Sequence, residues 1–589
     1  MHVVLGPAPA AAGTSPTGDV WVALALDDDA VASPGAPAPR TVATFPHAQA
    51  ADVVRSLPGG LGVEPGEVRW VLASAADEYA RWLAAGVSVD RCHDLALCQR
   101  ILALAASAPG GVRYAPAVDL PVPEPGAPAE PARRPDQDAM FELEEAGVPG
   151  ASDAAALCAE LAAQLAAVAG SAHPHRLRLL LAAESQGALV AAEMRAAGLP
   201  WRADLHAGLL EAQLGPRPAE GERPSRLQAL AERIGADLGM PGLNPDSQKD
   251  LLRALQTAGA TVDSTRQWEL QAWAAKGGAE RERREALIAP LLEYKALYRL
   301  WTANGWHWLD TWVREGRFHA TYLVGGVVTG RWAAHGGGAM QVPTAVRDAV
   351  RADPGGALTV ADASQVEPRI LAAMAQDAAL ARAGTTPDLY REVAEQGRSA
   401  GTALDDRSRA KVALLGAMYG ATTGDSAALL PHLRRLYPAA LGLLERAAAT
   451  GEAGGQVSTW LGRFSPAPEQ RWLDAVADRS TREAESRAGT LRRSAGRFTR
   501  NFVVQGTAAE WALCWMGEIR RRIRAAGMST TLVFFVHDEV VLHGPASEAE
   551  AVAGVVREAA SAAGRLLFGA APVDFPLTVA TVESYAHAK

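Results

Sequence analysis

Two aspartates in this sequence stand where a buried strand gives way to another element. In LTVADASQVEPRILAAM, apolar alternation predicts a short strand that stops at Asp362, and helical spacing begins at Glu367. In TLVFFVHDEVVLHGP, two apolar runs flank His537, Asp538 and Glu539, which predicts a tight hairpin with acids at its tip. Two strand-end aspartates brought together could hold a pair of Mg²⁺ ions roughly 3.5–4 Å apart, an arrangement suited to phosphoryl transfer.

A predicted helix in DDRSRAKVALLGAMYG carries groups suited to a nucleotide. Residues four apart share one helical face, and here they are Arg407, Lys411, Leu415 and Tyr419. Gly420 is placed to end the helix. The two cations would bind a triphosphate and the ring a base, whereas the alternative is a solvated basic stripe. The carboxylates elsewhere favour the nucleotide interpretation.

A basic segment, RRSAGRFTRNFVVQGTAAE, leads into a second helix. Its cations are Arg492, Arg493, Arg497 and Arg500, and more arginines follow at Arg520, Arg521, Arg522 and Arg524. Arginine contacts phosphates, whereas amides such as Asn501 and Gln505 can read acceptors along a groove. The amides favour nucleic-acid contact over a plain surface run.

Length, charge and cysteine usage limit the possible classes of protein. The 589 residues predict three or more subdomains, and a net charge of −9 does not by itself indicate a nucleic-acid binder. The four cysteines form no CxxC pair, so we expect neither a zinc site nor disulfides. Without a basic leader or an apolar run of about 18 residues, we expect a cytoplasmic protein that does not span a membrane.

The elements that must position these groups change in type along the chain. Up to residue 170, strand candidates at Val20–Leu26 and Val68–Ala73 alternate with helices, between Pro/Ala/Gly-rich stretches. A helical arm follows, in which Asp246 or Ser247 could cap one helix. Residues 318–375 mix strands and turns, residues 385–496 are mostly helical, and residues 497–589 return to mixed structure. Catalytic strands thus lie on both sides of a helical insertion.

Taken together, these motifs resemble those of the family A DNA polymerases. Residues 362–369 are similar to motif A, residues 407–420 to motif B and residues 536–539 to motif C, in the family's order; TGRWAAHGGGAMQVP resembles its TGR element. The similarity covers roughly residues 175–589, and the ending ESYAHAK resembles the family's C-terminus, which implies a complete polymerase module. It implies an α/β and α+β multidomain fold: a right-hand polymerase preceded by an RNase H-like exonuclease-type domain. The expected bounds are 1–172 for that domain and 173–589 for the polymerase, with the thumb at about 200–317, the palm at about 318–375 and 497–589, and the fingers at about 376–496.

The resemblance also implies a role for each residue. Asp362 and Asp538 would bind two Mg²⁺ ions, or Mn²⁺, and Glu539 would be an auxiliary acid. Arg407 and Lys411 would hold phosphates, Tyr419 would stack near the template base, and Glu367 would crowd the sugar 2′ position. The implied nucleotide site also includes Gln365 and Leu415, and the implied DNA contacts are Arg331, Arg497, Asn501, Gln505 and His537.

Three positions depart from the family's pattern. Ala363 stands where Tyr is usual, Leu415 where the fingers helix usually carries Phe or Tyr, and Tyr390 where His is common. Losing the ring at position 415 removes an apolar platform for the sugar. We therefore expect altered sugar discrimination or modest fidelity.

The N-terminal region lacks the acids that an exonuclease of this family needs. The expected first strand, VWVALAL, has no acid pair, and Asp27, Asp28 and Asp29 after it read as a solvated turn. CHDLALCQRIL resembles the segment after the central acid, and ASDAAALCAEL resembles the last motif but has Pro149 in place of the Tyr before Asp153. One acid cannot clamp two metals, so we expect a degenerate scaffold. We also expect no 5′-nuclease domain.

The leading hypothesis is a template-directed DNA polymerase without proofreading, in DNA repair or replication, acting as a monomer on primer-template DNA and dNTPs. Alternatives are the same module with an active exonuclease, and a catalytically silent DNA-binding protein. A single-subunit RNA polymerase fits the motifs less well, because Glu367 and the wording of motifs A and B match the DNA group.

Overall fold

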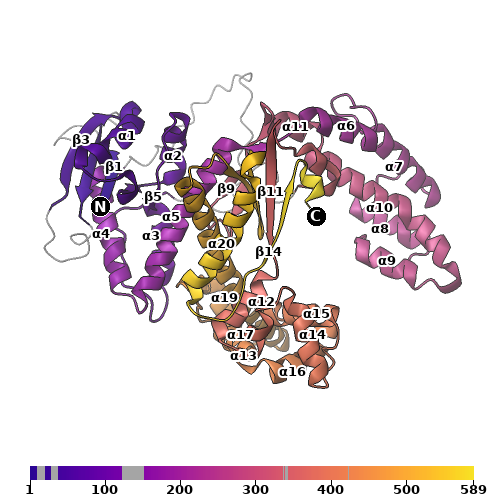
Figure 1. Cartoon of the computed structure of the whole chain (residues 1–589). Coiled ribbons are helices and arrows are strands. Elements are labelled where there is room, and N and C mark those ends of the chain that lie inside the picture. The colour runs from indigo at the N-terminus through magenta and orange to yellow at the C-terminus, as the bar shows by residue number, and fades with distance from the viewer. Residues whose placement is uncertain are drawn as a thin grey trace. The chain divides into compact units, whose positions relative to one another are not determined.

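The protein is described by a computed structural model that covers residues 1–9, 20–27, 38–121, 152–335, 337, 342–421 and 424–588 (Figure 1). Its contacts divide into two compact units. The first comprises Met1–Gly198, Ala320–Gly336 and Thr359–Thr581; the second comprises Leu199–His319, Gly337–Leu358 and Val582–Lys589. Asp28, Asp29 and Pro149, and most of the Pro/Ala/Gly-rich stretches, lie outside the described residues.

The first unit begins with a five-stranded mixed sheet in the order β3-β2-β1-β4-β5. The strands are β1 (His2–Pro7), β2 (Val20–Leu26), β3 (Arg40–Pro46), β4 (Arg69–Leu72) and β5 (Arg91–Asp94). β1 pairs antiparallel with β2 and parallel with β4. The strand expected to come first is therefore the second, because the short apolar run HVVLGP precedes it. The true first strand also contains no carboxylate.

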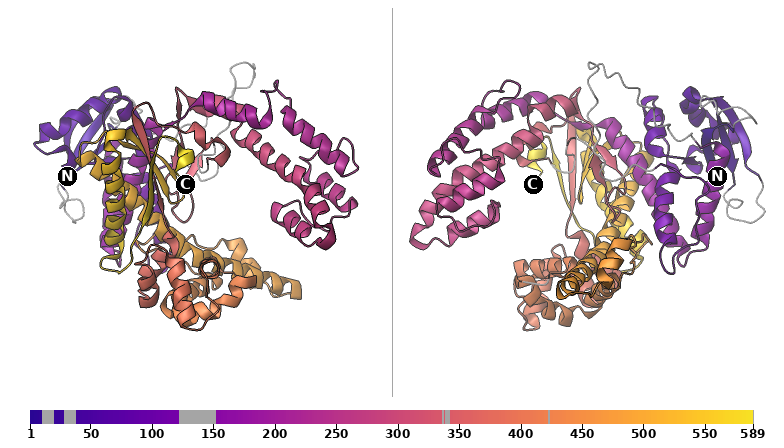
Figure 2. Two further views of the ribbon diagram at one scale, coloured as in Figure 1. Left: turned by 45° about the vertical axis from the view of Figure 1, so that its right-hand side comes forward. Right: turned by 180° about the vertical axis from the view of Figure 1, so that it is seen from behind.

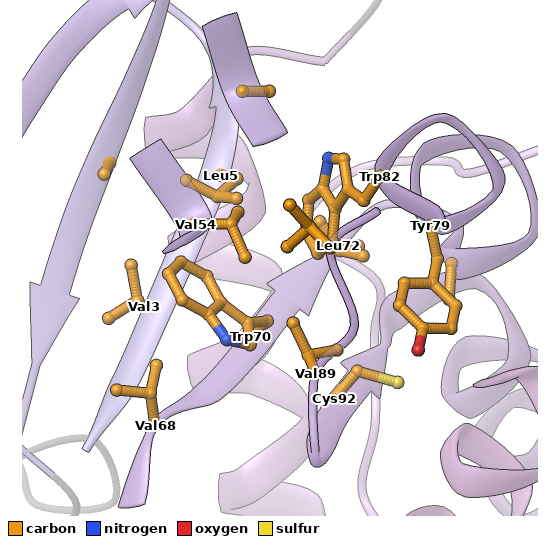
Figure 3. Packing of buried hydrophobic residues seen from close by; sticks show 14 of the residues in the cluster. Val3, Leu5, Val54, Val68, Trp70, Leu72, Tyr79, Trp82, Val89 and Cys92 are labelled. Atoms are coloured by element: carbon orange, nitrogen blue, oxygen red, sulfur yellow. The ribbon is translucent and has the colours of Figure 1, made fainter. Parts of the chain in front are cut away.

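Large apolar side chains fill one face of this sheet (Figure 3). Trp70 on β4 meets Trp82 edge-on at a ring-centroid distance of 6.1 Å, and Tyr79 packs edge-on against the same Trp82. The flanking helices are α1 (Ala50–Leu61), α2 (Ala75–Ala84), α3 (Leu95–Ala106), α4 (Ala154–Ala169) and α5 (Pro174–Ala197). The predicted alternation of strands and helices is confirmed here.

A second sheet carries the predicted catalytic strands. It runs in the order β12-β13-β11-β14, with β11 (Gly356–Ala363), β12 (Thr531–Val536), β13 (Glu539–Pro545) and β14 (Leu577–Val582). The 44-residue helix α19 (Arg482–Ala525) and α20 (Ala549–Phe568) pack on each other. A small hairpin of β9 (Thr321–Leu323) and β10 (Ala333–His335) is tied to β12, because the Tyr322 hydroxyl accepts from the Phe535 N–H and donates to the Phe535 carbonyl.

The segment between β11 and α19 is helical, as predicted. Its helices are α12 (Val366–Ala375), α13 (Ala378–Ala383), α14 (Leu389–Ser399), α15 (Arg407–Tyr419), α16 (Gly424–Leu436), α17 (Pro438–Glu452) and α18 (Gln470–Ala477). Aspartates cap three of them: Asp377, Asp388 and Asp406 each accept N–H groups of the first turn. Short polar caps thus set where these helices begin.

The second unit is mainly helical. It contains β6 (Leu199–Pro200), α6 (Ala203–Leu214), α7 (Ser225–Asp237), α8 (Gln248–Thr257), α9 (Gln267–Ala275), α10 (Arg281–Asn304), α11 (Trp306–Trp312), β7 (Val313–Arg314) and β8 (Arg317–Phe318). α10 packs along α7 and α9 (Figure 2). Ser247, one of the two predicted caps, accepts the Asp250 N–H. Within the described ranges, no helix is both long enough and apolar enough to cross a membrane.

Candidate active site

The two predicted metal-binding aspartates lie on neighbouring strand ends. The backbone N–H of Ala363, which follows Asp362, donates to the carbonyl of Asp538 at 2.9 Å. Val536 pairs with Glu539, so His537 and Asp538 form a two-residue hairpin loop. His537 has a φ of +54°, the sign that a type II′ turn requires at its first central residue. This unusual backbone places Asp538 beside the end of β11.

The electrostatics of the pair fit divalent cations. Burial raises the pKa of Asp538; the nearby carboxylates of Glu367 and Asp362 add to that shift, and Arg331 opposes it. Such a concentration of carboxylate oxygens suits Mg²⁺, a hard cation that is bound through few protein ligands plus substrate phosphates. In the described part of the chain, no group of three or more His, Cys, Asp or Glu side chains has metal-binding geometry. A divalent ion held by the two aspartates would take its remaining ligands from phosphate and water oxygens.

Glu367 forms a cluster with residues from two other segments. Arg331 donates to one of its carboxylate oxygens at 2.7 Å, and the Tyr419 hydroxyl donates to the other at 2.8 Å. Burial and the Glu367 carboxylate raise the pKa of Tyr419 to about 12. The structure thus brings together three residues to which the family resemblance gave roles: Tyr419 at the template base, Glu367 at the sugar and Arg331 at the DNA. The phenol is held by hydrogen bonding to the carboxylate.

Arg407 and Gln365 meet at the start of α14. Asp388 accepts from Arg407 Nε at 2.6 Å and from Gln365 Nε2 at 3.0 Å, while Gln365 Oε1 accepts the Leu389 N–H. Burial tends to raise the pKa of Asp388, but these hydrogen bonds outweigh it, and the pKa is lowered. Gln365 therefore joins the end of β11 to α14, a contact that the sequence did not predict.

The rest of the α15 face is open. Lys411 is exposed, Leu415 is half-buried, and Tyr419 is 45% exposed. Gly420 ends the helix in the left-handed conformation, as predicted. Tyr390, one of the departures from the family's pattern, is buried on α14, and its ring centroid lies 5.9 Å from the Arg407 guanidinium carbon. Arg407 and Lys411, the predicted cations four residues apart on α15, are both exposed.

Arg497, Asn501 and Gln505 follow one face of α19 at intervals of four residues, and none of them is buried. A Cβ atom added to Gly420 would lie 2.6 Å from the Arg497 side chain, so α15 and α19 meet closely there. Asn501 is near enough to Tyr419 to affect the pKa of its hydroxyl. The predicted DNA-contacting face therefore adjoins the predicted nucleotide face.

The four arginines at the end of α19 have another role. Arg520 is buried and pairs with Glu193 at 2.7 Å, and Arg524 pairs with Asp90 at 2.8 Å. Arg521 and Arg522 both pair with Glu518. The pairs of Arg520 and Arg524 join α19 to α5 and to the segment before β5, whereas those of Arg521 and Arg522 stay within α19. At Arg520 and Arg524 the basic pattern is therefore structural.

Sequence reasoning missed Arg369, although it lies in motif A. The side chain is fully buried and donates to five carbonyl oxygens, those of Ser364, Gly384, Thr386, Pro387 and Asp574. Desolvation lowers the pKa of this guanidinium to about 10. The sequence singled out its neighbour Glu367 as a carboxylate, whereas only burial identifies Arg369 as the group that joins the end of β11 to the loop before α14.

Comparisons with known proteins agree with this geometry. The model of DNA polymerase family A matches residues 219–584. DNA polymerase I of Chloroflexus aurantiacus is 29% identical over 270 residues, which are 42% of this chain and 27% of that protein. DNA polymerase I of Pseudomonas aeruginosa is 29% identical over 289 residues, or 45% of this chain and 29% of that protein. The chain thus matches less than a third of the length of these relatives.

A solved structure is similar in fold over almost the whole chain. It is the POL domain of Pol1 from M. smegmatis in complex with DNA primer-template and dNTP. The TM-score is 0.63 and the identity 19%, with 99% of this chain and 96% of that chain covered. At that identity the likeness concerns the fold, and the mixed α/β, helix-rich polymerase architecture expected from the motifs is confirmed.

Proposed function

The chain belongs to DNA polymerase family A, and from this premise we propose that it extends the 3′-hydroxyl of a primer with dNTPs on a DNA template. The observation that carries the proposal is the Ala363 N–H to Asp538 carbonyl bond of 2.9 Å, which holds two aspartate-bearing strand ends together. A protein that only bound DNA would have no need of paired metal carboxylates beside a cationic helix face.

Asp362 and Asp538 would hold two divalent ions, with Glu539 as an auxiliary acid on the adjoining strand. When bound there, Mg²⁺ or Mn²⁺ supplies charge stabilisation for the attacking and leaving oxygens of phosphoryl transfer. Arg407 and Lys411 would neutralise the charge that develops on pyrophosphate. Arg407 would first exchange its bond to Asp388 for the phosphate.

The Glu367 cluster would select the sugar. A carboxylate held by Arg331 and Tyr419 has little freedom to move aside for a 2′-hydroxyl, so the cluster favours deoxynucleotides. Gln365 would act indirectly, by holding the start of α14, and Leu415 would present an aliphatic surface to the sugar. Arg497, Asn501, Gln505 and His537 would contact the duplex.

We assign the palm to 318–375 and 497–589, the fingers to 376–496, the thumb to 200–317 and an inactive exonuclease-type domain to 1–172. Support for inactivity comes from the one retained acid, Asp153, and from Asp94 in the segment that resembles the one after the central acid. Asp153 accepts the Ala156 N–H and caps α4, while buried Asp94 caps α3 and has a pKa raised to about 6 by desolvation. Both acids serve the fold. A monomeric state and a cytoplasmic location remain predictions.

Primer extension on a 5′-overhang template with Mg²⁺ tests the polymerase assignment. We expect extension by the parent protein and by Glu550→Gln, an exposed carboxylate on α20, but none by Asp538→Asn. Duplex binding, followed by fluorescence anisotropy, should be similar in all three. A parent protein that binds duplex but extends no primer with Mg²⁺ or Mn²⁺ would instead support the silent DNA-binding alternative.

A lane without nucleotides, run on a primer with a 3′ mismatch, tests the exonuclease assignment. We expect the primer to remain intact. Shortening of the primer by the parent protein but not by Asp153→Ala would show an active nuclease and refute the degenerate-scaffold assignment.

A further inference from the structure

The turn that carries Arg331 lies on a buried ionic cluster outside the active site. Its backbone closes on itself, because Val327 N–H donates to the Arg331 carbonyl at 3.0 Å and Gly330 N–H to the Val327 carbonyl at 2.7 Å. Gly330 has a φ of +86°, and a Cβ atom there would lie 2.5 Å from Nε of Arg463. The turn therefore approaches the Arg463 guanidinium with no room for a side chain.

Arg463 is held from the other side by Glu184 of α5. Its Nη2 lies 2.8 Å from Glu184 Oε2, and the two side chains are 4% and 0% exposed. Arg100 of α3 is 3.9 Å from the other oxygen of Glu184 and donates to the carbonyl of Val324, at the start of the turn. α5 also packs against β9, which precedes the turn (Figure 1).

A second set of bonds keeps Arg463 in place. The backbone N–H of Arg463 donates to Thr459 Oγ1, and the Thr459 hydroxyl in turn donates to the carboxylate of Glu510 on α19. Glu510 also accepts the Leu461 N–H at 3.0 Å. The loop that carries Arg463 is thereby fastened to the helix that bears the predicted DNA-contacting face.

We propose that the Arg463–Glu184 ion pair is a positioning device for the turn 325–331, which holds Arg331 against Glu367 and so sets the strictness of nucleotide selection. This inference rests on the proposed polymerase function. A buried ion pair costs desolvation free energy and contributes little net stability compared with apolar side chains of similar volume. The Arg463–Glu184 pair packs against Gly330, and the residue after Gly330 is Arg331, which binds Glu367. A positioning role explains why charged side chains are buried at this place.

The decisive variant is the double replacement Arg463→Met with Glu184→Met. Exchanging both partners for apolar side chains removes both charges of the pair, and Arg100, which is 22% exposed, keeps its bond to the Val324 carbonyl, so we expect the thermal midpoint to stay close to that of the parent. Selection of dNTP over rNTP, measured as the ratio of kcat/KM values, should fall about tenfold, the effect of weakening one charge-assisted hydrogen bond. The change should lie mainly in a higher kcat/KM for rNTP, because a Glu367 carboxylate that Arg331 holds less firmly can move aside for the 2′-hydroxyl.

The matched control is the Arg520–Glu193 pair of the same unit, in which Arg520 is 4% and Glu193 23% exposed, replaced in the same way by Arg520→Met with Glu193→Met. It does not touch the turn, so we expect unchanged selection. In an Arg331→Ala background the Arg463/Glu184 replacement should have no further effect on selection, because its effect passes through Arg331. Unchanged selection in the Arg463/Glu184 variant, or an equal loss in the Arg520/Glu193 control, would overturn the proposal.

Hydrogen exchange separates this proposal from the polymerase assignment. In the nucleotide-free protein the amides of Val327 and Gly330 are bonded within the turn, and we expect them to exchange faster in the Arg463/Glu184 variant but not in the control. If the parent extends no primer but the turn loses protection as expected, the polymerase assignment fails and the positioning role stands. Unchanged protection would refute the positioning role.

Discussion

Replacing Arg369 by lysine should strongly destabilise the first unit, although the exchange keeps the charge. The guanidinium donates to five carbonyl oxygens inside the protein, and an ammonium group has three donors. At least two carbonyls would lose their partner in a buried site. Hydrogen bonds to charged groups are worth roughly 1.5–3 kcal/mol each, so the loss should be about 3–6 kcal/mol.

Urea unfolding followed by circular dichroism measures this loss. The control is Arg391→Lys, an exposed residue of α14. We expect a lower urea midpoint for Arg369→Lys and an unchanged midpoint for Arg391→Lys. Because the Ser364 carbonyl lies two residues from Asp362, the lysine variant should also extend primers more slowly under native conditions. A change in unfolding free energy below about 1 kcal/mol, the effect of an ordinary substitution, would refute the reasoning.

Two further predictions concern nucleotide selection and pH. Leu415→Phe restores a ring beside the incoming sugar and should change discrimination among dNTP, rNTP and dideoxynucleotide in steady-state incorporation; identical selectivity in both proteins would contradict this. Burial raises the pKa of Glu510 to about 7 from 4.5, with nearby Arg463 opposing and Glu184 adding to the shift. A raised folded-state pKa means that the stability is complete below pH 4.5 and is lost as the pH rises to about 7. Over that window Glu510→Gln should therefore remove up to about 3 kcal/mol of the pH-dependent loss of unfolding free energy, so the thermal midpoint measured by calorimetry should fall less as the pH rises. An unchanged pH profile would show that Glu510 does not titrate there.

Local patterns predicted much of the candidate site. Alternation placed the strand before Asp362, the two apolar runs around His537 produced the expected hairpin, and Gly420 ended α15 as expected. Such features depend on neighbours within a few residues, and their signals therefore survive in the sequence alone.

Contacts between distant segments could not be predicted in this way. The sequence pattern indicated a basic approach to nucleic acid at the end of α19, whereas the structure shows Arg520 and Arg524 in ion pairs with Glu193 and Asp90. The family resemblance implied a nucleotide contact for Gln365, and its bonds to the start of α14 were not predicted. A basic run has the same appearance on a solvated face and at a buried interface, since only packing determines which carboxylates lie opposite it.

The sequence by itself therefore determined the family, and it predicted the strands that carry Asp362 and Asp538 and the side chains of the candidate site. Only the tertiary structure decided which polar groups support them. Arg463 and Glu184 are 279 residues apart, and Arg369 reaches the carbonyl of Asp574 across 205. No periodicity encodes such pairs, because they arise when separate elements bury polar groups that must then find partners in one another.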